Sequence, residues 1–262
     1  MYSHEHLLFL KKIKKNKRYV HITQVMILFL FIFAWQLFAD LEIINTFISS
    51  SPKNVLETIL ELIKDGKLWY HIWVKCYETM ISFSLGTGLG FLIATVLWWF
   101  PFLAKVLDPY LTILNSLPKV ALGPIIIIWI GANINSIIFM ALLISSIISV
   151  ITIYNGFKNT DIEKIKLMKS LNATKFQIYT TLILRGNIDT IISSLKINIS
   201  MCLIGVIMGE LLVSKEGIGY LIMYGSQVFN LNLVMTGVVL LVIISCILYY
   251  LISYLERKLV RN

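Results

Sequence analysis

Six apolar runs, each near the length of a membrane-crossing helix, constrain this sequence more than any other feature. Because a helix rises about 1.5 Å per residue, about 20 apolar residues cross the hydrocarbon core. The predicted spans are 20–39, 73–100, 109–130, 136–154, 188–208 and 228–254. The runs are continuously apolar rather than alternating, which favours helices over a barrel. The sequence therefore predicts an all-α polytopic membrane protein with about six transmembrane helices.

The composition agrees with this fold class and argues against nucleic-acid binding. Hydrophobic residues make up 58% of the 262 residues, whereas soluble domains are roughly half apolar. The lipid bilayer is therefore the expected surrounding. The net charge of +9 could suggest a nucleic-acid partner, but the basic residues lie between apolar runs and not on one polar face. No nucleic-acid partner is predicted.

The sequence indicates no cofactor, metal or catalytic chemistry. The three cysteines stand singly in apolar runs, and the four histidines are terminal or interfacial and form no HExxH motif. No Ser/His/Asp set and no paired carboxylates converge in the spans, and no GxxxxGK[ST] phosphate loop occurs. We expect a protein that is not an enzyme, so any ATPase must be another polypeptide.

Lysines and arginines predict the orientation, because cells keep them on the cytoplasmic side of short loops. With the N-terminus inside, sixteen of the 23 lie on the cytoplasmic side and two, Lys119 and Lys196, lie inside spans. The outer side holds the remaining five, Lys53, Lys64, Lys67, Lys75 and Lys215. We therefore expect a multi-pass protein of the plasma or inner membrane with both termini in the cytoplasm.

The spans divide the chain into four predicted parts. These are a cytoplasmic tail at 1–19, a first transmembrane helix at 20–45, an external amphipathic segment at 46–72, and a core of five transmembrane helices at 73–262. The basic stretch 11–18 also resembles the start of a secretory signal. The apolar run that follows is too long for one, however, and Leu37 occupies the −3 position where a small residue is needed. A retained anchor is predicted.

Two connecting segments have amphipathic patterns of their own. In 51–69, apolar positions such as Val55 and Ile59 alternate at helical spacing with Glu57 and Glu61, which predicts a helix on the outer surface. The cytoplasmic loop 157–187 predicts two short amphipathic helices with a bend near Asn172.

Small residues recur every four positions in the second span, at Ser82, Gly86, Gly90 and Ala94. Such a stripe lets another helix approach closely. We interpret it as a packing surface and not as a nucleotide fingerprint, because it lies in the middle of a span.

The third span contains the strongest candidate for a transport pathway. Pro118 and Pro124 remove backbone donors on either side of Lys119, and a broken helix at membrane depth is tolerated only against protein or a water-filled cavity. Lys119 has two interpretations, lining of the pathway or snorkelling of its long stem to the interface. Lys196, eight residues into the fifth span, has the same two interpretations.

Glu210 ends the fifth span beside a glycine-rich stretch that includes Gly217 and Gly219. A carboxylate at this position is expected to be an interfacial residue held by water or by Lys215. The clustered glycines predict a tight, non-helical segment near the outer face, which is consistent with a gate.

The order of these features resembles the permease subunits of ABC importers of the nitrate/sulfonate/taurine type. The resemblance runs from about Ser51 to the C-terminus. It rests on six segments: His71-Ile-Trp-Val with the glycine stripe, Asp108-Pro109, Leu117 to Pro124, Trp129-Ile-Gly131, the loop 161–185, and Gly209-Glu210 with Gly217-Ile-Gly219-Tyr220.

The cytoplasmic loop departs from the family pattern. Family members usually read EAA, three residues, Gly, nine residues, then I-x-L-P, whereas this chain has Lys166-Leu167-Met168, Asn172 and Leu182-Ile183-Leu184-Arg185 at those places. The resemblance implies that the loop is the coupling helix, formed by Met168, Leu171, Asn172, Ala173, Thr174 and Phe176.

The resemblance also implies the partners and the mechanism. It implies a type I importer in which two permease copies lie on two ABC ATPase subunits and an extracellular or periplasmic binding protein delivers the solute. Closure of the ATPases would rock the spans between inward-open and outward-open states. The solute would be a sulfonate, nitrate or a vitamin precursor such as a thiamine pyrimidine or riboflavin. The span patterns themselves make Pro118, Lys119, Lys196 and Glu210 the candidates for lining its path.

Three alternatives differ in what they require. A secondary transporter would need a coupling-ion site and two repeats in one chain, but the spans show few buried acids and no obvious duplication. A membrane-embedded enzyme would need a catalytic constellation, and a purely structural subunit would need neither. Co-purification of an ATPase with substrate-stimulated hydrolysis would distinguish them.

Overall fold

This computed structural model describes residues 4–260, and within them the chain is helical, with no strand. The longer helices are α1 (His4–Asp40), α3 (Pro52–Lys64), α4 (Lys67–Trp99), α5 (Pro101–Ser116), α7 (Ile134–Lys158), α10 (Ile188–Val213) and α12 (Leu231–Val260). The shorter ones are α2 (Thr46–Ser49), the 3-10 turn η1 (Lys119–Leu122), α6 (Gly123–Ile130), α8 (Ile162–Ser170), α9 (Lys175–Ile178), the π-helical turn η2 (Tyr179–Leu184) and α11 (Ile218–Gln227).

Five described helices are long and apolar enough to cross a membrane: α1, α4, α7, α10 and α12. The bent pair formed by α5 with η1 and α6 brings the number to six if it counts as one span. The prediction of an all-α membrane protein with about six spans is therefore confirmed.

The third predicted span, 109–130, is wrong as a continuous helix. α5 begins eight residues earlier, at Pro101, and the chain bends by 85° between Pro101–Ser116 and Lys119–Ile130. Leu117 is extended at the bend, with ψ 137°, as expected for a residue that precedes proline. The predicted break at Pro118 is therefore present, and it separates two shorter helices.

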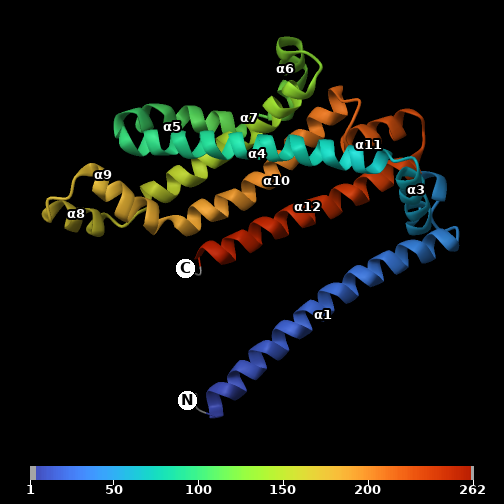
Figure 1. Ribbon diagram of the computed structural model, residues 1–262, viewed down its shortest axis with the longest axis horizontal. Coiled ribbons are helices and arrows are strands. Elements are labelled where there is room, and N and C mark those ends of the chain that lie inside the picture. Colours follow the sequence, from blue (N-terminus) through green and yellow to red (C-terminus); the bar gives the residue numbers. More distant parts are fainter. Residues whose placement is uncertain (1–3, 261–262) are drawn as a thin grey trace.

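The core of the bundle is the contact of α4 with α7 and of α7 with α10 (Figure 1). A Cβ atom added to Gly86 or Gly90 on α4 would overlap the side chain of Ser145 or Ser149 on α7. The small-residue stripe of the second span therefore packs against α7, which confirms its interpretation as a helix-packing surface.

The first helix stands apart from this bundle and approaches it at α3 (Figure 1). The backbone N–H of Lys53 donates to Oε1 of Gln36 at 3.1 Å. The predicted tail 1–19 starts outside the described residues, and from His4 onward it is continuous with α1. α1 ends at Asp40 and not at residue 45, and the predicted segment 46–72 contains α2, α3 and the first turn of α4.

The loop 157–187 contains the two predicted short helices, α8 and α9, separated by a turn at Asn172, where φ is +58°. Thr174 and Gln177 form a capping box that begins α9. We call the end of the bundle that carries α8 and α9 the loop end; α3 and α11 lie at the opposite end (Figure 1).

Candidate functional site

A buried ion pair joins α4 to α10 near the opposite end of the bundle. Nζ of Lys75 lies 3.3 Å from Oε2 of Glu210, and both side chains are fully buried. The same Oε2 accepts a hydrogen bond from the backbone N–H of Gly219 at 2.6 Å. Glu210 therefore connects α4, α10 and the start of α11.

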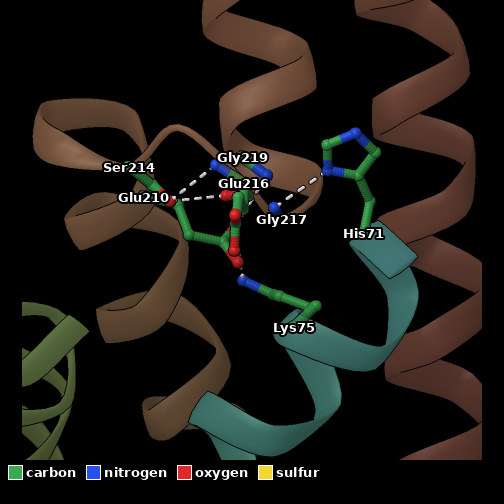
Figure 2. Close-up of polar contacts among 7 residues, drawn as sticks. All are labelled: His71, Lys75, Glu210, Ser214, Glu216, Gly217 and Gly219. Atoms are coloured by element: carbon green, nitrogen blue, oxygen red, sulfur yellow. Dashed lines mark hydrogen bonds and ion pairs between the residues drawn. The ribbon is translucent and has the colours of Figure 1, made fainter. Parts of the chain in front are cut away.

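The segment between α10 and α11 is held at two further points (Figure 2). The N–H of Gly217 donates to Nδ1 of His71 at 3.1 Å, so this imidazole accepts at Nδ1. The hydroxyl of Ser214 donates to the carbonyl of Glu216 and accepts from the N–H of the same residue. We call residues 214–219, with these contacts, the outer turn.

Glycine is required at two positions of the outer turn. Gly217 has φ +90°, and a Cβ atom there would overlap Oε1 of Glu210. A Cβ atom on Gly219 would lie 2.6 Å from Oε2 of Glu210. The predicted tight, non-helical segment is present at 214–217, and Gly219 already lies in the first turn of α11. The glycines are needed because both approach the carboxylate closely.

The sequence analysis predicted the wrong partner for Glu210. We expected water or Lys215, but the carboxylate is buried against Lys75, while Lys215 is exposed. Counting Lys75 among the outer loop lysines was also wrong, because its side chain is fully buried.

A signal for Lys75 was available in the sequence. Lys75, Glu78 and Ser82 continue the helical spacing of the stripe at Gly86 and Gly90. The face of α4 that packs against the bundle therefore extends through a lysine and a glutamate. A carboxylate partner on a neighbouring helix could have been expected for that lysine.

The other predicted pathway residues lie elsewhere. Pro118 is exposed and Lys119 is half-buried, and Nζ of Lys119 donates to the carbonyl of Asn115 at 2.9 Å, so it caps the broken end of α5. Lys196 is half-buried on α10, fourteen residues from Glu210, which is about 21 Å along a helix. Lys196 and Glu210 therefore do not belong to one site.

The predicted coupling residues divide into two groups. Leu171 is 70% exposed and Phe176 is 65% exposed, and Asn172 and Thr174 are also exposed. Met168 and Ala173 are half-buried and pack against the cluster that includes Phe157, Ile178, Tyr179 and Ile183. The turn thus presents the side chains of Leu171 and Phe176 outward, and Met168 and Ala173 attach it to the bundle.

Lys175 attaches the loop to the end of α4. Its Nζ donates to the carbonyl of Trp99 at 2.5 Å and lies 5.8 Å from the ring centroid of Trp98 and 5.2 Å from that of Trp99. The hydroxyls of Thr95 and Tyr179 are 2.6 Å apart. The lysine neutralises the negative end of the α4 dipole and contacts two aromatic faces.

Comparison with known proteins decides what this arrangement belongs to. Residues 86–261 match the family described as "Binding-protein-dependent transport system inner membrane component". The chain belongs to this family. The match covers the stripe of α4 from Gly86 onward, the broken third span, the loop 157–187 and the outer turn.

Relatives with named roles are transport permeases. A Bacillus subtilis (strain 168) permease protein named for aliphatic sulfonates transport, SsuC, is 26% identical over 94% of this chain and 89% of its own length. The taurine transport system permease protein TauC of Escherichia coli (strain K12) is 23% identical, over 86% of this chain and 84% of its own. The formylaminopyrimidine transport permease protein ThiX of Halalkalibacterium halodurans is 25% identical over 71% of this chain and 74% of its own length.

A solved structure has the same fold. A chain of the MetNI methionine ABC transporter in an inward-facing conformation superposes with a TM-score of 0.64 at 18% identity, covering 76% of this chain and 96% of that one. The chain is thus a multi-pass permease subunit of an ABC importer, and ATP hydrolysis belongs to a separate subunit. Its partners are an ATPase and a substrate-binding protein, and the secondary-transporter alternative is set aside.

Proposed function

We propose that two copies of this chain form the membrane part of the importer, that two ATPase subunits bind at the loop end, and that the loop end faces the cytoplasm. In this arrangement Leu171, Asn172, Thr174 and Phe176 enter a groove on the ATPase, while Met168 and Ala173 transmit its movement to the bundle. Both termini then lie in the cytoplasm, together with sixteen of the lysines and arginines.

One observation supports this proposal most strongly: an exposed apolar pair on a rigid turn. Leu171 and Phe176 are both well exposed and stand on either side of the turn at Asn172, whereas the other exposed apolar residues of the loop, Ile162 and Leu167, lie earlier, on α8. The capping box at Thr174 and the left-handed Asn172 fix the backbone that carries them. Large apolar side chains on such a frame are typical of the centre of a protein interface.

The direct test is Leu171→Asp. A charge placed at the centre of the interface should prevent the ATPase from co-purifying and should abolish uptake, while the permease still inserts in the membrane. Ile162→Asp is the matched control, because Ile162 is also exposed, at 65%, but lies in the first turn of α8, where an acid is favourable. Normal uptake by Leu171→Asp would overturn the proposal.

We propose as the transported solute a small anionic or strongly hydrogen-bonding molecule, such as a sulfonate, nitrate or a vitamin precursor. The relatives named for sulfonates, taurine and formylaminopyrimidine support this class. A cationic residue at the break of the third span, Lys119, would favour such a solute if the break lines the path.

Lys119→Met tests the role of the break. If Lys119 lines the path, the variant should raise the KM for an anionic solute several-fold while the ATPase remains bound. Unchanged affinity and rate would show that the ammonium only caps α5.

A further inference from the structure

The buried cluster at the opposite end contains more negative than positive charge. Lys75, Glu78 and Glu210 are each at most 1% exposed. The ion pair between Lys75 and Glu210 is the only buried salt bridge within the described residues. If all three groups were ionised, a net negative charge would be buried in a membrane-spanning bundle. An uncompensated buried charge costs several kcal/mol.

Hydrogen bonding indicates where the imbalance is relieved. Oε2 of Glu210 already accepts from Lys75 and from Gly219, so Glu210 is held as a carboxylate. Oε1 of Glu210 and Oε2 of Glu78 are buried, and neither accepts a hydrogen bond from a donor in the described part of the chain. Glu78 lies three residues after Lys75 on the buried face of α4, so its carboxyl group is within the electrostatic reach of Glu210. Two carboxylates only accept, so one proton between them would satisfy both.

The surroundings supply no second positive charge. The charged groups that act on Glu78 are Glu210 on α10, Lys75 on α4 and Glu216 in the outer turn. Lys215 lies on the wall of a cavity of about 280 Å³ that also touches Glu78, but its side chain is exposed. A proton is therefore the cation that fits this cluster.

We propose that Glu78 is a neutral carboxylic acid that donates its proton to Glu210, and that Lys75, Glu78 and Glu210 form a one-proton network that holds the outer turn against α4. The three are positioning residues. Lys75 and Glu78 fix the Glu210 carboxylate. Figure 2 shows that the carboxylate accepts from Lys75 and from the N–H of Gly219, and that His71 accepts from the N–H of Gly217. The network thereby fixes the junction of α10 and α11 at the end of the bundle opposite the ATPase contact.

Because Glu78 is neutral whereas Lys75 and Glu210 are charged, substitutions at these positions should differ in their effect on stability. Glu78→Gln keeps a neutral group of the same shape that can donate to Glu210, so it should keep most of the wild-type thermal stability. Glu78→Leu removes the donor and should lower Tm. Lys75→Met leaves a buried carboxylate unpaired and should lower Tm the most, by about 5 °C or more. Lys75→Met combined with Glu210→Gln should recover part of that loss, because it removes both charges.

Infrared spectroscopy on the purified permease provides a second readout that does not depend on folding of the harsher variants. The wild type should show the carbonyl stretch of a protonated carboxylic acid that persists across neutral pH, and Glu78→Gln should lose that band. Absence of the band, or a Glu78→Gln variant as unstable as Lys75→Met, would overturn the proposal. Neither readout uses the solute or the ATPase, so the result is independent of the coupling and substrate proposals.

Discussion

Asn172 shows how a single residue sets the geometry of the turn between α8 and α9. Its φ of +58° lies in the left-handed region, where asparagine and glycine are tolerated and a β-branched residue is not. We predict that Asn172→Gly retains uptake, because glycine adopts this backbone freely. Asn172→Val should strain the turn by about 1–2 kcal/mol and reduce uptake and ATPase co-purification.

The control for this prediction is Asn159→Val. Asn159 is also exposed and also follows a helix, but its φ is −84°, so valine should be accommodated there. Equal loss of uptake in both valine variants would contradict a specific role for the left-handed backbone.

The structural role of a residue was predictable from the sequence where it follows from a local pattern. It was not predictable where it depends on a partner far away in the chain. The bend at Asn172 follows from its place between two amphipathic patterns. Glu210 could be placed beside the glycines, but its partner Lys75 is 135 residues away. Only the bundle packing brings these two side chains together.

At the scale of elements, the close contact of α4 with α7 depends on glycines, which have no side chain to hold the two helices apart. A Cβ atom on Gly90 would overlap Ser149, whereas one on Gly88 meets nothing within 4 Å. Gly90→Val should therefore force the helices apart and destabilise the protein by about 1–3 kcal/mol, measured as a lower Tm in detergent. Gly88→Val makes the same chemical change on an exposed face of the same helix and should shift Tm little; similar losses in both variants would contradict the packing argument.

The attachment of the loop to α4 gives a second prediction at this scale. Lys175→Met removes the hydrogen bond to Trp99 and the contacts with two indole rings. We expect the ATPase still to bind, since Leu171 and Phe176 remain, but more ATP to be hydrolysed per solute transported. Lys169→Met removes the same charge from the same loop and should leave this ratio near the wild-type value. A wild-type ratio in Lys175→Met would show that coupling does not need the contact of Lys175 with the end of α4.

The elements were predictable to the extent that apolar length determines them. Four of the six predicted spans correspond to single helices whose ends differ from the predicted ones by at most six residues, and α1 extends well beyond its span on the N-terminal side. The prediction of the third span was wrong because counting consecutive apolar residues merges two helices that are joined by an apolar bend. Pro118 indicated the break, but the 85° angle depends on how α6 packs against α7.

At the scale of the whole molecule, α4 connects the loop end with the outer turn. Its last residue, Trp99, accepts from Lys175 of the loop. Its first turns carry His71, which accepts from Gly217 of the outer turn, and Lys75, which donates to Glu210. The helix has 33 residues, or about 50 Å at 1.5 Å per residue. A displacement of the loop end can therefore reach the outer turn through one continuous helix, which gives the coupling proposal a physical connection.

The orientation of this helix in the membrane is the last prediction. Because Lys75 is buried, four lysines remain on the outer side, Lys53, Lys64, Lys67 and Lys215, against sixteen basic residues on the other. This correction strengthens the charge asymmetry that supports the proposed cytoplasmic position of the loop end. In a variant whose three native cysteines are replaced, Lys53→Cys on intact cells should react with a membrane-impermeant maleimide. Lys164→Cys should react only after permeabilisation, since both positions are exposed and differ only in their side of the membrane. Labelling of Lys164→Cys on intact cells would reverse the topology and remove the basis for ATPase docking at Leu171 and Phe176.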